Sequence, residues 1–264
     1  MTSPAAGPPS TLLYASDPLR AFAEFASWPL SLSVMRRAPH ADGRPVLVLP
    51  GLLAGDLSTR PLRNMMYRTG SHVHGWHLGR NLGPTQQVEA GLRSLVERLA
   101  ERHGSKIALI GWSLGGIYAR ATAAERPDLV AQVITLGTPF AMDDPGQTRA
   151  QRAYDRYAHL HVPGRGLPIP AEVRGPLPVP ATSIWSRLDG VVSWRASVET
   201  PSPTAENIAV HGSHLGLGHH PAVMWAVADR LAQPPGTWAP FVAPRALRRL
   251  YAPVPAEGAG RRAA

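Results

Sequence analysis

Hydrophobic residues in this chain are grouped in two ways that repeat along most of its length. Short continuous apolar runs, bounded by Gly, Pro or polar residues, predict buried β-strands. Between these runs, apolar residues recur every three or four positions, which predicts amphipathic helices. The strands are expected within residues 44–51, 71–78, 106–112, 130–137, 181–186 and 206–210, and the helices over 59–69, 84–104, 114–125 and 221–232. Such alternation predicts an α/β fold with a mostly parallel sheet of about six strands and helices on both faces.

The segment before the first strand, residues 1–44, is expected to form an N-terminal arm that is partly disordered. Residues 1–18 are rich in Pro, Ser and Ala, which favours disorder. Residues 19–37 carry large apolar side chains, interrupted by Pro29, and predict a helix that packs on the core. The alternative is that this helical segment faces a membrane.

Two further segments depart from the alternation. Residues 140–178, inside a core that spans 45–232, begin polar and become rich in Pro and Gly. They predict a small insertion that forms a cap or lid between the fourth and fifth strands. Residues 233–264 are basic and are expected to form a partly disordered C-terminal extension.

Composition and charge narrow the class of protein. Hydrophobic residues make up 44% of the 264 positions and charged residues 17%, which is typical of a globular domain. The formal charge is +9, but Lys106 is the one lysine among 27 basic residues and the arginines are scattered. We therefore expect no nucleic-acid partner, and at most a weak peripheral attraction to anionic lipid. The chain has no cysteine, which excludes thiolate chemistry and cysteine-bound zinc.

The sequence also suggests where the protein resides. No apolar stretch approaches the roughly 20 residues of a membrane span. The start, MTSPAAGPPS, is polar and lacks the basic and then apolar order of a signal peptide. These features predict a cytoplasmic protein, with possible peripheral contact at the inner membrane face.

A serine between glycines is the first candidate for chemistry. The stretch 111–115 reads Gly-Trp-Ser-Leu-Gly, with Ser113 directly after a predicted strand and directly before a predicted helix. This is the setting of a nucleophile elbow, a sharp turn that crowds the positions two before and two after the serine, where Gly111 and Gly115 stand. The plainer interpretation is that Ser113 is only the N-cap of the helix.

A serine hydroxyl is a weak nucleophile without a base, so an acid and a histidine are needed downstream. Asp189 follows the strand at 181–186, and His214 follows the next strand within a Gly-containing loop. The order Ser113, Asp189, His214 predicts a catalytic triad. In it, the carboxylate orients the imidazole, and the imidazole takes the proton of the serine and returns it to the leaving group.

Other residues could fill the acid and base positions. His211 lies against the end of the strand, and His219 with His220 stands at the start of the last helix, where a protonated ring is disfavoured. Asp143 and Asp144 follow an earlier strand and are alternative acids. A metal site built from these histidines is not expected, because the segment lacks nearby carboxylate ligands.

The third requirement is a pair of N–H donors for an oxyanion. One is the backbone N–H of Leu114, the residue after the candidate nucleophile. The other is expected in the loop VLPGLLAGD, where Leu52 follows Pro50-Gly51, with Leu53 as the fallback if the loop is longer. Leu53 and Trp112 are also expected to offer apolar surface to a substrate.

The pieces LVLPGLLAGD, LIGWSLGGIYAR, ITLGTPF, RLDGVV and GSHLGLGHHP occur in this order between about residue 45 and residue 232. In this set the chain resembles the α/β-hydrolase superfamily, in particular its bacterial esterases and lipases. Two departures stand out. Pro50-Gly51 replaces the usual His-Gly of the oxyanion loop, and the opening antiparallel strands are missing, which leaves a trimmed sheet.

The resemblance implies a serine hydrolase that cleaves carboxylic esters through an acyl-enzyme, with a cap over the serine and a preference for apolar acyl chains. Its substrate would be a small-molecule or lipid ester. Acyl transfer to another acceptor uses the same triad, as does cleavage of a thioester or amide. A non-enzymatic ligand-binding protein on the same fold is the other alternative. No cofactor or metal is expected, because no phosphate loop or dinucleotide motif follows a strand.

Overall fold

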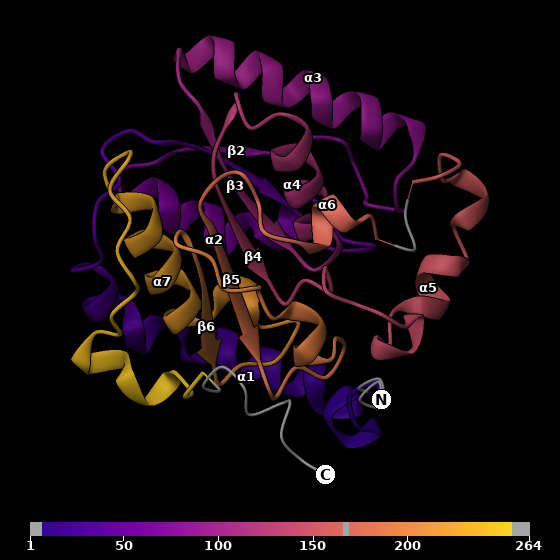
Figure 1. Cartoon of the computed structure of the whole chain (residues 1–264). Coiled ribbons are helices and arrows are strands. Elements are labelled where there is room, and N and C mark those ends of the chain that lie inside the picture. The colour runs from indigo at the N-terminus through magenta and orange to yellow at the C-terminus, as the bar shows by residue number, and fades with distance from the viewer. Residues whose placement is uncertain (1–6, 166–168, 255–264) are drawn as a thin grey trace.

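A six-stranded sheet organises the computed structural model, which describes residues 7–165 and 169–254 (Figure 1). Along the chain its strands are β1 (Pro45–Leu49), β2 (His72–Gly75), β3 (Ile107–Trp112), β4 (Val130–Leu136), β5 (Ala181–Ser186) and β6 (Ala205–Val210). They lie in the order β2-β1-β3-β4-β5-β6, and every pairing is parallel. The predicted fold class is therefore confirmed, with six strands as expected.

Helices cover both faces of the sheet. On one face, α2 (Asp56–Arg68) and α7 (Pro221–Ala232) pack on inward side chains of the strands such as Val48 and Ile110. On the other, α3 (Gln86–His103) and α4 (Leu114–Glu125) pack on residues such as Leu47 and Leu109. Adjacent residues of one strand thus point to opposite cores, which explains why the strands read as continuous apolar runs.

The helix ends follow local chemistry. Thr85 caps α3 by accepting a hydrogen bond from the N–H of Val88, and the helix ends at Gly104, whose φ of 58° suits glycine. Pro221 occupies the first position of α7, where its missing N–H costs nothing. These signals are local, so the predicted bounds of both helices lie within two residues of those observed.

The N-terminal arm is more ordered than expected. Helix α1 runs from Thr11 to Met35, with Pro18 and Pro29 inside it, so Pro29 does not interrupt the helix. Ser10 caps it by accepting a hydrogen bond from the N–H of Leu13. The expectation of disorder is wrong for residues 11–18, and residues 1–6 lie outside the described part. The prediction relied on the Pro, Ser and Ala content of residues 1–18, which does not reveal the Ser10 cap or the buried contacts of Asp17.

The insertion at 140–178 consists of short helices, α5 (Gln151–Asp155) and α6 (Ala171–Arg174), with the 3-10 turns η1 (Pro145–Gln147) and η2 (Ala158–Leu160). A buried guanidinium ties it to the core. Arg120 of α4 donates to the carbonyl oxygens of Val173 and Gly175 and pairs with the buried carboxylate of Glu199. The insertion is therefore fastened to α4, at the helix that begins beside Ser113.

The C-terminal extension is ordered as far as residue 254. It contains the 3-10 segment η5 (Arg245–Leu250), and Tyr251 forms a β-bridge with Val210 at the outer edge of β6. The hydroxyl of Tyr251 donates to the carbonyl oxygen of Ala222 at 2.8 Å. The extension thus covers a sheet edge, and residues 255–264 lie outside the described part. Within residues 7–165 and 169–254, no helix combines the length and the hydrophobicity needed to cross a membrane.

Candidate active site

Ser113 occupies a strained turn between β3 and α4. Its φ is 52° and its ψ is −122°, a conformation that costs a non-glycine residue about 1–3 kcal/mol. The flanking glycines make the turn possible. A Cβ on Gly111 would lie 2.3 Å from the Cα of Gly116, and one on Gly115 would lie 2.4 Å from the carbonyl oxygen of Leu49. The turn thus fits the elbow predicted from the sequence, and Ser113 makes no side-chain cap hydrogen bond to α4.

Asp189 and His214 form a buried pair at the carboxyl ends of β5 and β6. The Oδ2 atom of Asp189 lies 2.7 Å from Nδ1 of His214, and both side chains are almost fully buried. The other oxygen, Oδ1, accepts hydrogen bonds from the N–H groups of Val191 and Val192 at 2.8 and 2.7 Å. These contacts fix the carboxylate, which in turn fixes the tautomer and orientation of the ring.

The serine turn and the acid–histidine pair meet across β4. The N–H of Ser113 donates to the carbonyl oxygen of Leu136 at 2.8 Å. The next residue, Gly137, lies against the pair: a Cβ there would stand 3.0 Å from Oδ2 of Asp189 and 3.1 Å from Nδ1 of His214. A Cβ there would also stand 2.8 Å from Leu217, so a side chain is crowded out, and the φ of 52° also favours glycine.

Trp112 supports this junction from the core. It is buried, and its Nε1 donates to the carbonyl oxygen of His214 at 3.2 Å. Its ring packs on Gly218, where a Cβ would approach the indole to 2.4 Å. The structure thus places Trp112 under the histidine loop, and it is not among the described residues that line the pocket at Ser113.

The pKa of His214 reflects two opposing influences. Burial lowers the pKa by disfavouring the charged ring, while the charge and hydrogen bond of Asp189 raise it, with a smaller contribution from the charge of Asp17. The electrostatic influences prevail, so the pKa of His214 lies above its ordinary value of 6.5. Such a ring is a stronger base than a free imidazole.

The alternative bases lie elsewhere. His211 is exposed at the end of β6. One ring nitrogen of His219, Nε2, lies 2.9 Å from the carbonyl oxygen of Ala21, and burial lowers the pKa of His220 to about 4. The structure brings none of these rings to Asp189, whose imidazole partner is His214.

The alternative acids are also engaged away from the serine. Asp143 is exposed and pairs with Arg174 of the insertion, while Asp144 accepts from the N–H of Gly146 and caps η1. Both therefore serve local contacts at the start of the insertion.

The loop after β1 lies against the serine, as expected for a donor loop. A Cβ on Gly51 would stand 3.2 Å from the Cβ of Ser113, and Leu52 and Leu114 line the same pocket as the serine. Leu53 lies differently. Its N–H donates to the carbonyl oxygen of Asn81 at 2.7 Å. That N–H is therefore already engaged and is not available to an oxyanion.

Asn81 holds this loop and was not found from the sequence. Its side-chain amide donates to the carbonyl oxygen of Pro50, and its backbone N–H donates to the carbonyl oxygen of Ala54, each at 2.8 Å. Its Oδ1 accepts from the N–H of Gly83. A single buried asparagine about thirty residues from the loop gives no sequence signal for this contact.

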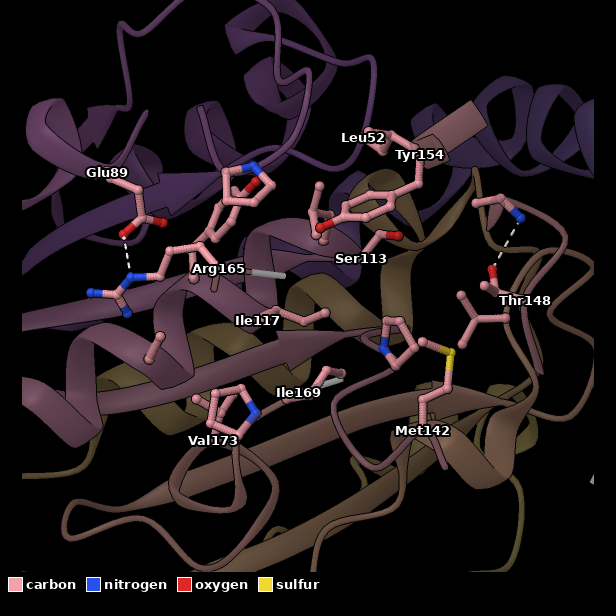
Figure 2. A pocket seen from close by; sticks show the side chains of 18 of the residues that line it. Leu52, Glu89, Ser113, Ile117, Met142, Thr148, Tyr154, Arg165, Ile169 and Val173 are labelled. Atoms are coloured by element: carbon pink, nitrogen blue, oxygen red, sulfur yellow. Dashed lines mark hydrogen bonds and ion pairs between the residues drawn. The ribbon is translucent and has the colours of Figure 1, made fainter. Parts of the chain in front are cut away.

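A pocket of about 380 Å³ opens at Ser113, a size typical of small-molecule sites (Figure 2). Its walls come from three places: the loop after β1, one face of α4 and the insertion. Most of the side chains are apolar, and they include Leu52, Leu114, Ile117, Ala121, Met142, Tyr154, Ile169, Val173 and Val192. The insertion therefore supplies one wall of the pocket at Ser113. Leu53, which was expected to contact substrate, is not among the described residues that line this pocket.

The far end of the pocket carries charged groups that the sequence analysis missed. Figure 2 shows Glu89 and Arg165 together at one side of the pocket, apart from Ser113. Nε of Arg165 lies 3.3 Å from Oε2 of Glu89, and the same guanidinium donates to Glu125 at 2.8 Å. Burial raises the pKa of Glu89 more than Arg165 lowers it. The three residues come from α3, α4 and the insertion, so their proximity is a property of the fold alone.

The described residues contain no group of three His, Cys, Asp or Glu side chains placed to hold a metal ion.

Comparison with known proteins gives partial sequence matches. No family model matches the chain. A stretch of 57 residues is 44% identical to a triacylglycerol lipase of Pseudarthrobacter phenanthrenivorans and 44% identical to one of Burkholderia plantarii. The matched stretch is 22% of this chain and spans only 18% and 16% of those relatives' lengths.

Solved structures match over more of the chain. Lipase B of Aspergillus fumigatus has a TM-score of 0.54 at 16% identity, over 75% of this chain and 54% of that one. The mature form of a Bacillus licheniformis lipase has a TM-score of 0.51 at 15% identity, over 74% and 94%. An α/β hydrolase from a sediment metagenome of the Mar Chica lagoon has a TM-score of 0.50 at 20% identity, over 69% and 87%. The chain has the α/β-hydrolase fold.

Proposed function

We propose that this protein is a serine hydrolase that cleaves carboxylic esters through an acyl-enzyme. The observation that carries the proposal is the junction across β4. There, the N–H of Ser113 in its strained turn bonds to Leu136, and the next residue, Gly137, lies against the buried Asp189–His214 pair. The lipase names of the partial relatives agree with an ester as the substrate class.

In the proposed first half-reaction, His214 accepts the proton of the Ser113 hydroxyl as its oxygen attacks the ester carbonyl carbon. The carbonyl oxygen becomes an oxyanion, which the N–H groups of Leu52 and Leu114 are proposed to bind. Each such donor stabilises the transition state by about 3–4 kcal/mol. The C–O bond to the alcohol then breaks, and His214 returns the proton to the departing alcohol oxygen. Asp189 stabilises the imidazolium throughout.

The second half-reaction repeats the chemistry with water. His214 takes a proton from a water molecule as its oxygen attacks the acyl carbon. The bond from the acyl carbon to the Ser113 oxygen breaks, and the proton returns to that oxygen. The products are a carboxylic acid and free enzyme. An alcohol in place of water would give a new ester, so hydrolysis and acyl transfer share every residue of the site.

The apolar wall of the pocket supports a preference for uncharged esters with apolar acyl chains. Each CH₂ group that leaves water contributes about 0.8 kcal/mol of binding. The charged groups at the far end, Glu89, Glu125 and Arg165, lie away from Ser113 and would limit the longest chains rather than the short ones.

A peripheral contact with anionic lipid stays a prediction. The surface that would make it is the outer side of α1, where Leu12, Leu19, Phe22 and Phe25 are exposed. Co-sedimentation with anionic vesicles that is lost in Phe22→Ser would support the contact, and equal sedimentation of both proteins would contradict it.

Hydrolysis of p-nitrophenyl butyrate by the full chain and three variants tests the proposed function. We expect Ser113→Ala to lose turnover on the order of 10⁶-fold and Asp189→Asn about 10⁴-fold, by analogy with other serine hydrolase triads. Asp144→Asn is the matched control, because this carboxylate caps an exposed turn, and it should keep wild-type turnover.

Near-normal hydrolysis by Ser113→Ala would contradict the mechanism. A normal Asp189→Asn with an inactive Asp144→Asn would move the acid to the earlier loop. Butyryl transfer to added ethanol in excess of hydrolysis would favour the acyltransferase. A wild-type protein that binds the ester without turnover would favour a ligand-binding protein.

A further inference from the structure

Helix α1 departs from the usual pattern of a surface helix, in which apolar side chains face the core and charged ones face solvent. Its outward side carries Leu19, Phe22 and Phe25, which are at least half exposed, while Asp17 on its inward side is 1% exposed. Burying a carboxylate is costly unless hydrogen bonds satisfy it. The groups that donate hydrogen bonds to Asp17 therefore explain how its carboxylate can be buried.

Asp17 contacts both loops that carry the acid and the histidine. Its Oδ2 accepts hydrogen bonds from the N–H of Gly190, next to Asp189, and from the N–H of His214 itself, each at 2.9 Å. Its Oδ1 accepts from the N–H of Leu215 at 3.0 Å. One carboxylate thus binds the residue after the candidate acid and the candidate base.

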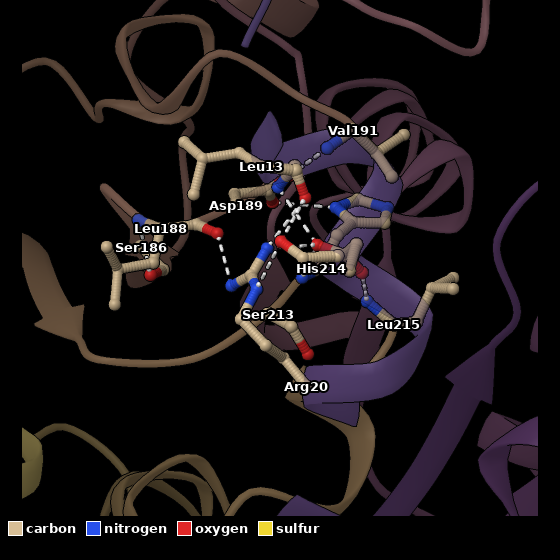
Figure 3. A network of polar contacts seen from close by, with 12 residues as sticks. Leu13, Arg20, Ser186, Leu188, Asp189, Val191, Ser213, His214 and Leu215 are labelled. Atoms are coloured by element: carbon tan, nitrogen blue, oxygen red, sulfur yellow. Dashed lines mark hydrogen bonds and ion pairs between the residues drawn. The ribbon is translucent and has the colours of Figure 1, made fainter. Parts of the chain in front are cut away.

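Two neighbours on α1 extend the contact. Arg20 pairs with Asp17 at 3.2 Å and donates to the carbonyl oxygen of Leu188 at 2.7 Å. Glu24 accepts from the N–H and the hydroxyl of Ser213, both at 2.8 Å. Figure 3 shows Arg20 of α1 within the network that includes Asp189, Ser213 and His214. The helix therefore contacts residues 188, 190, 213, 214 and 215 through three side chains.

We propose that Asp17 is the positioning residue of the active site, and that with Glu24 it holds the acid loop and the histidine loop at the separation that catalysis requires. The three hydrogen bonds that Asp17 accepts from backbone N–H groups fix the positions of the two loops relative to each other. The negative charge of Asp17 also lies close enough to favour the imidazolium of His214. The inference rests on the proposed function, because it assigns Asp17 a role in the same reaction.

The charged and titratable groups around His214 come from three elements. Asp189 approaches from the loop after β5, and Asp17, Arg20 and Glu24 come from α1. His219 and His220 stand in the segment that leads into α7. Of these groups, Asp189 and Asp17 are the two whose charges act on His214 to raise its pKa. Removal of the Asp17 charge should therefore lower that pKa.

The test compares Asp17→Asn, Asp17→Glu, Glu24→Gln and the control Glu206→Gln in the full chain. Glu206 is a largely buried carboxylate that pairs with Arg230, far from the site. For each protein, kcat and KM for p-nitrophenyl butyrate are measured from pH 5 to 9, with thermal unfolding as a check of folding. Activity of the wild-type enzyme establishes the proposed function separately.

We expect Asp17→Asn to lower kcat at least about tenfold with KM within about twofold, because the groups that bind substrate are unchanged. The acid limb of kcat/KM should move to lower pH, since the imidazolium loses a nearby negative charge. Asp17→Glu should lower kcat but leave the acid limb in place, because it keeps the charge. Glu24→Gln should lower kcat severalfold, and Glu206→Gln should change neither quantity.

A folded Asp17→Asn with wild-type kcat and an unmoved acid limb would overturn the inference. If Asp17→Asn fails to fold, Glu24→Gln decides, because Glu24 is half-buried at the rim of the same loop, and a wild-type kcat there would also overturn it. Active wild-type enzyme together with active variants would reject only the positioning role, and an inactive wild type would reject the proposed function itself.

Discussion

At the scale of single residues, the site depends on conformations that few side chains tolerate. Ser113 has a positive φ, which its N–H bond to Leu136 and the two close glycines of the turn maintain. Gly137 lies against the Asp189–His214 pair, where a Cβ would crowd both side chains. The strained turn costs about 1–3 kcal/mol, and it directs the serine out of the sheet toward the pocket.

The pKa of His214 leads to a prediction for pH. The base accepts a proton only when neutral, so activity should be full above its pKa and fall as pH drops through it. Because Asp189 raises that pKa above 6.5, the acid limb of kcat/KM should have its midpoint above pH 6.5. The pH profile of p-nitrophenyl butyrate hydrolysis provides the measurement.

Asp189→Asn is the matched control for this profile. Its residual activity should have an acid limb at lower pH, since the carboxylate that favours the imidazolium is gone. A wild-type profile that stays flat down to pH 4, or a limb that Asp189→Asn leaves in place, would show that His214 is not the base.

Candidate site residues that directly follow a strand could be predicted from the sequence. Residues that hold their loops through hydrogen bonds could not. Ser113, Asp189 and His214 each follow a predicted strand, and parallel strands bring such positions to one edge of the sheet. Asp17 and Asn81 act through hydrogen bonds to backbone groups far along the chain. Because a backbone N–H is present at almost every residue, such contacts leave no pattern in the sequence.

At the scale of elements, α4 forms one wall of the pocket. Leu114, Ile117, Ala121 and Glu125 recur at helical spacing along the side that faces the cavity. At a rise of about 1.5 Å per residue, Ala121 lies about 12 Å along the axis from the serine. In the proposed reaction the acyl chain would therefore lie along α4, from Ser113 toward the charged end of the pocket.

This geometry predicts how acyl-chain length affects activity. In a p-nitrophenyl ester series, kcat/KM of the wild type should rise from acetate to hexanoate, by up to about fourfold per CH₂. Ala121→Phe should leave acetate unchanged and lower kcat/KM for decanoate, because the ring fills the pocket beyond the short chains. Acetate serves as the internal control.

Acetate as the best substrate of the wild type would show that the pocket does not bind the acyl chain. If Ala121→Phe left the ratio of kcat/KM for decanoate to kcat/KM for acetate unchanged, the acyl chain would not lie beside Ala121.

Elements with an apolar inner face were predicted well, whereas α1 was predicted only in part. The apolar periodicity of α3 and α7 marks the side that packs on the sheet. In α1 the inner side carries Asp17 and Glu24 beside the buried Ala21, while Leu19, Phe22 and Phe25 are exposed. The rule that buried faces are apolar therefore fails for the helix that contacts the candidate site most closely.

At the scale of the whole molecule, four distant parts of the chain meet at one edge of the sheet. The turn after β3, the loops after β5 and β6, and helix α1 converge there, and residues of the insertion line the pocket at Ser113. The N-terminal arm, whose helix was expected to pack on the core, contributes Asp17 to this assembly. Removal of the arm would therefore release the two loops that carry Asp189 and His214.

Labelling with a fluorescent alkyl phosphonate, followed by mass mapping of the modified peptide, tests the central claim most directly. The account predicts that wild-type protein is labelled at one residue, Ser113, because the activated hydroxyl displaces the leaving group and the adduct is held in the oxyanion site. Ser113→Ala should remain folded and unlabelled, and Asp189→Asn should label far more slowly. Equal labelling of wild type and Ser113→Ala, or a folded wild-type protein that the reagent does not modify, would contradict the account.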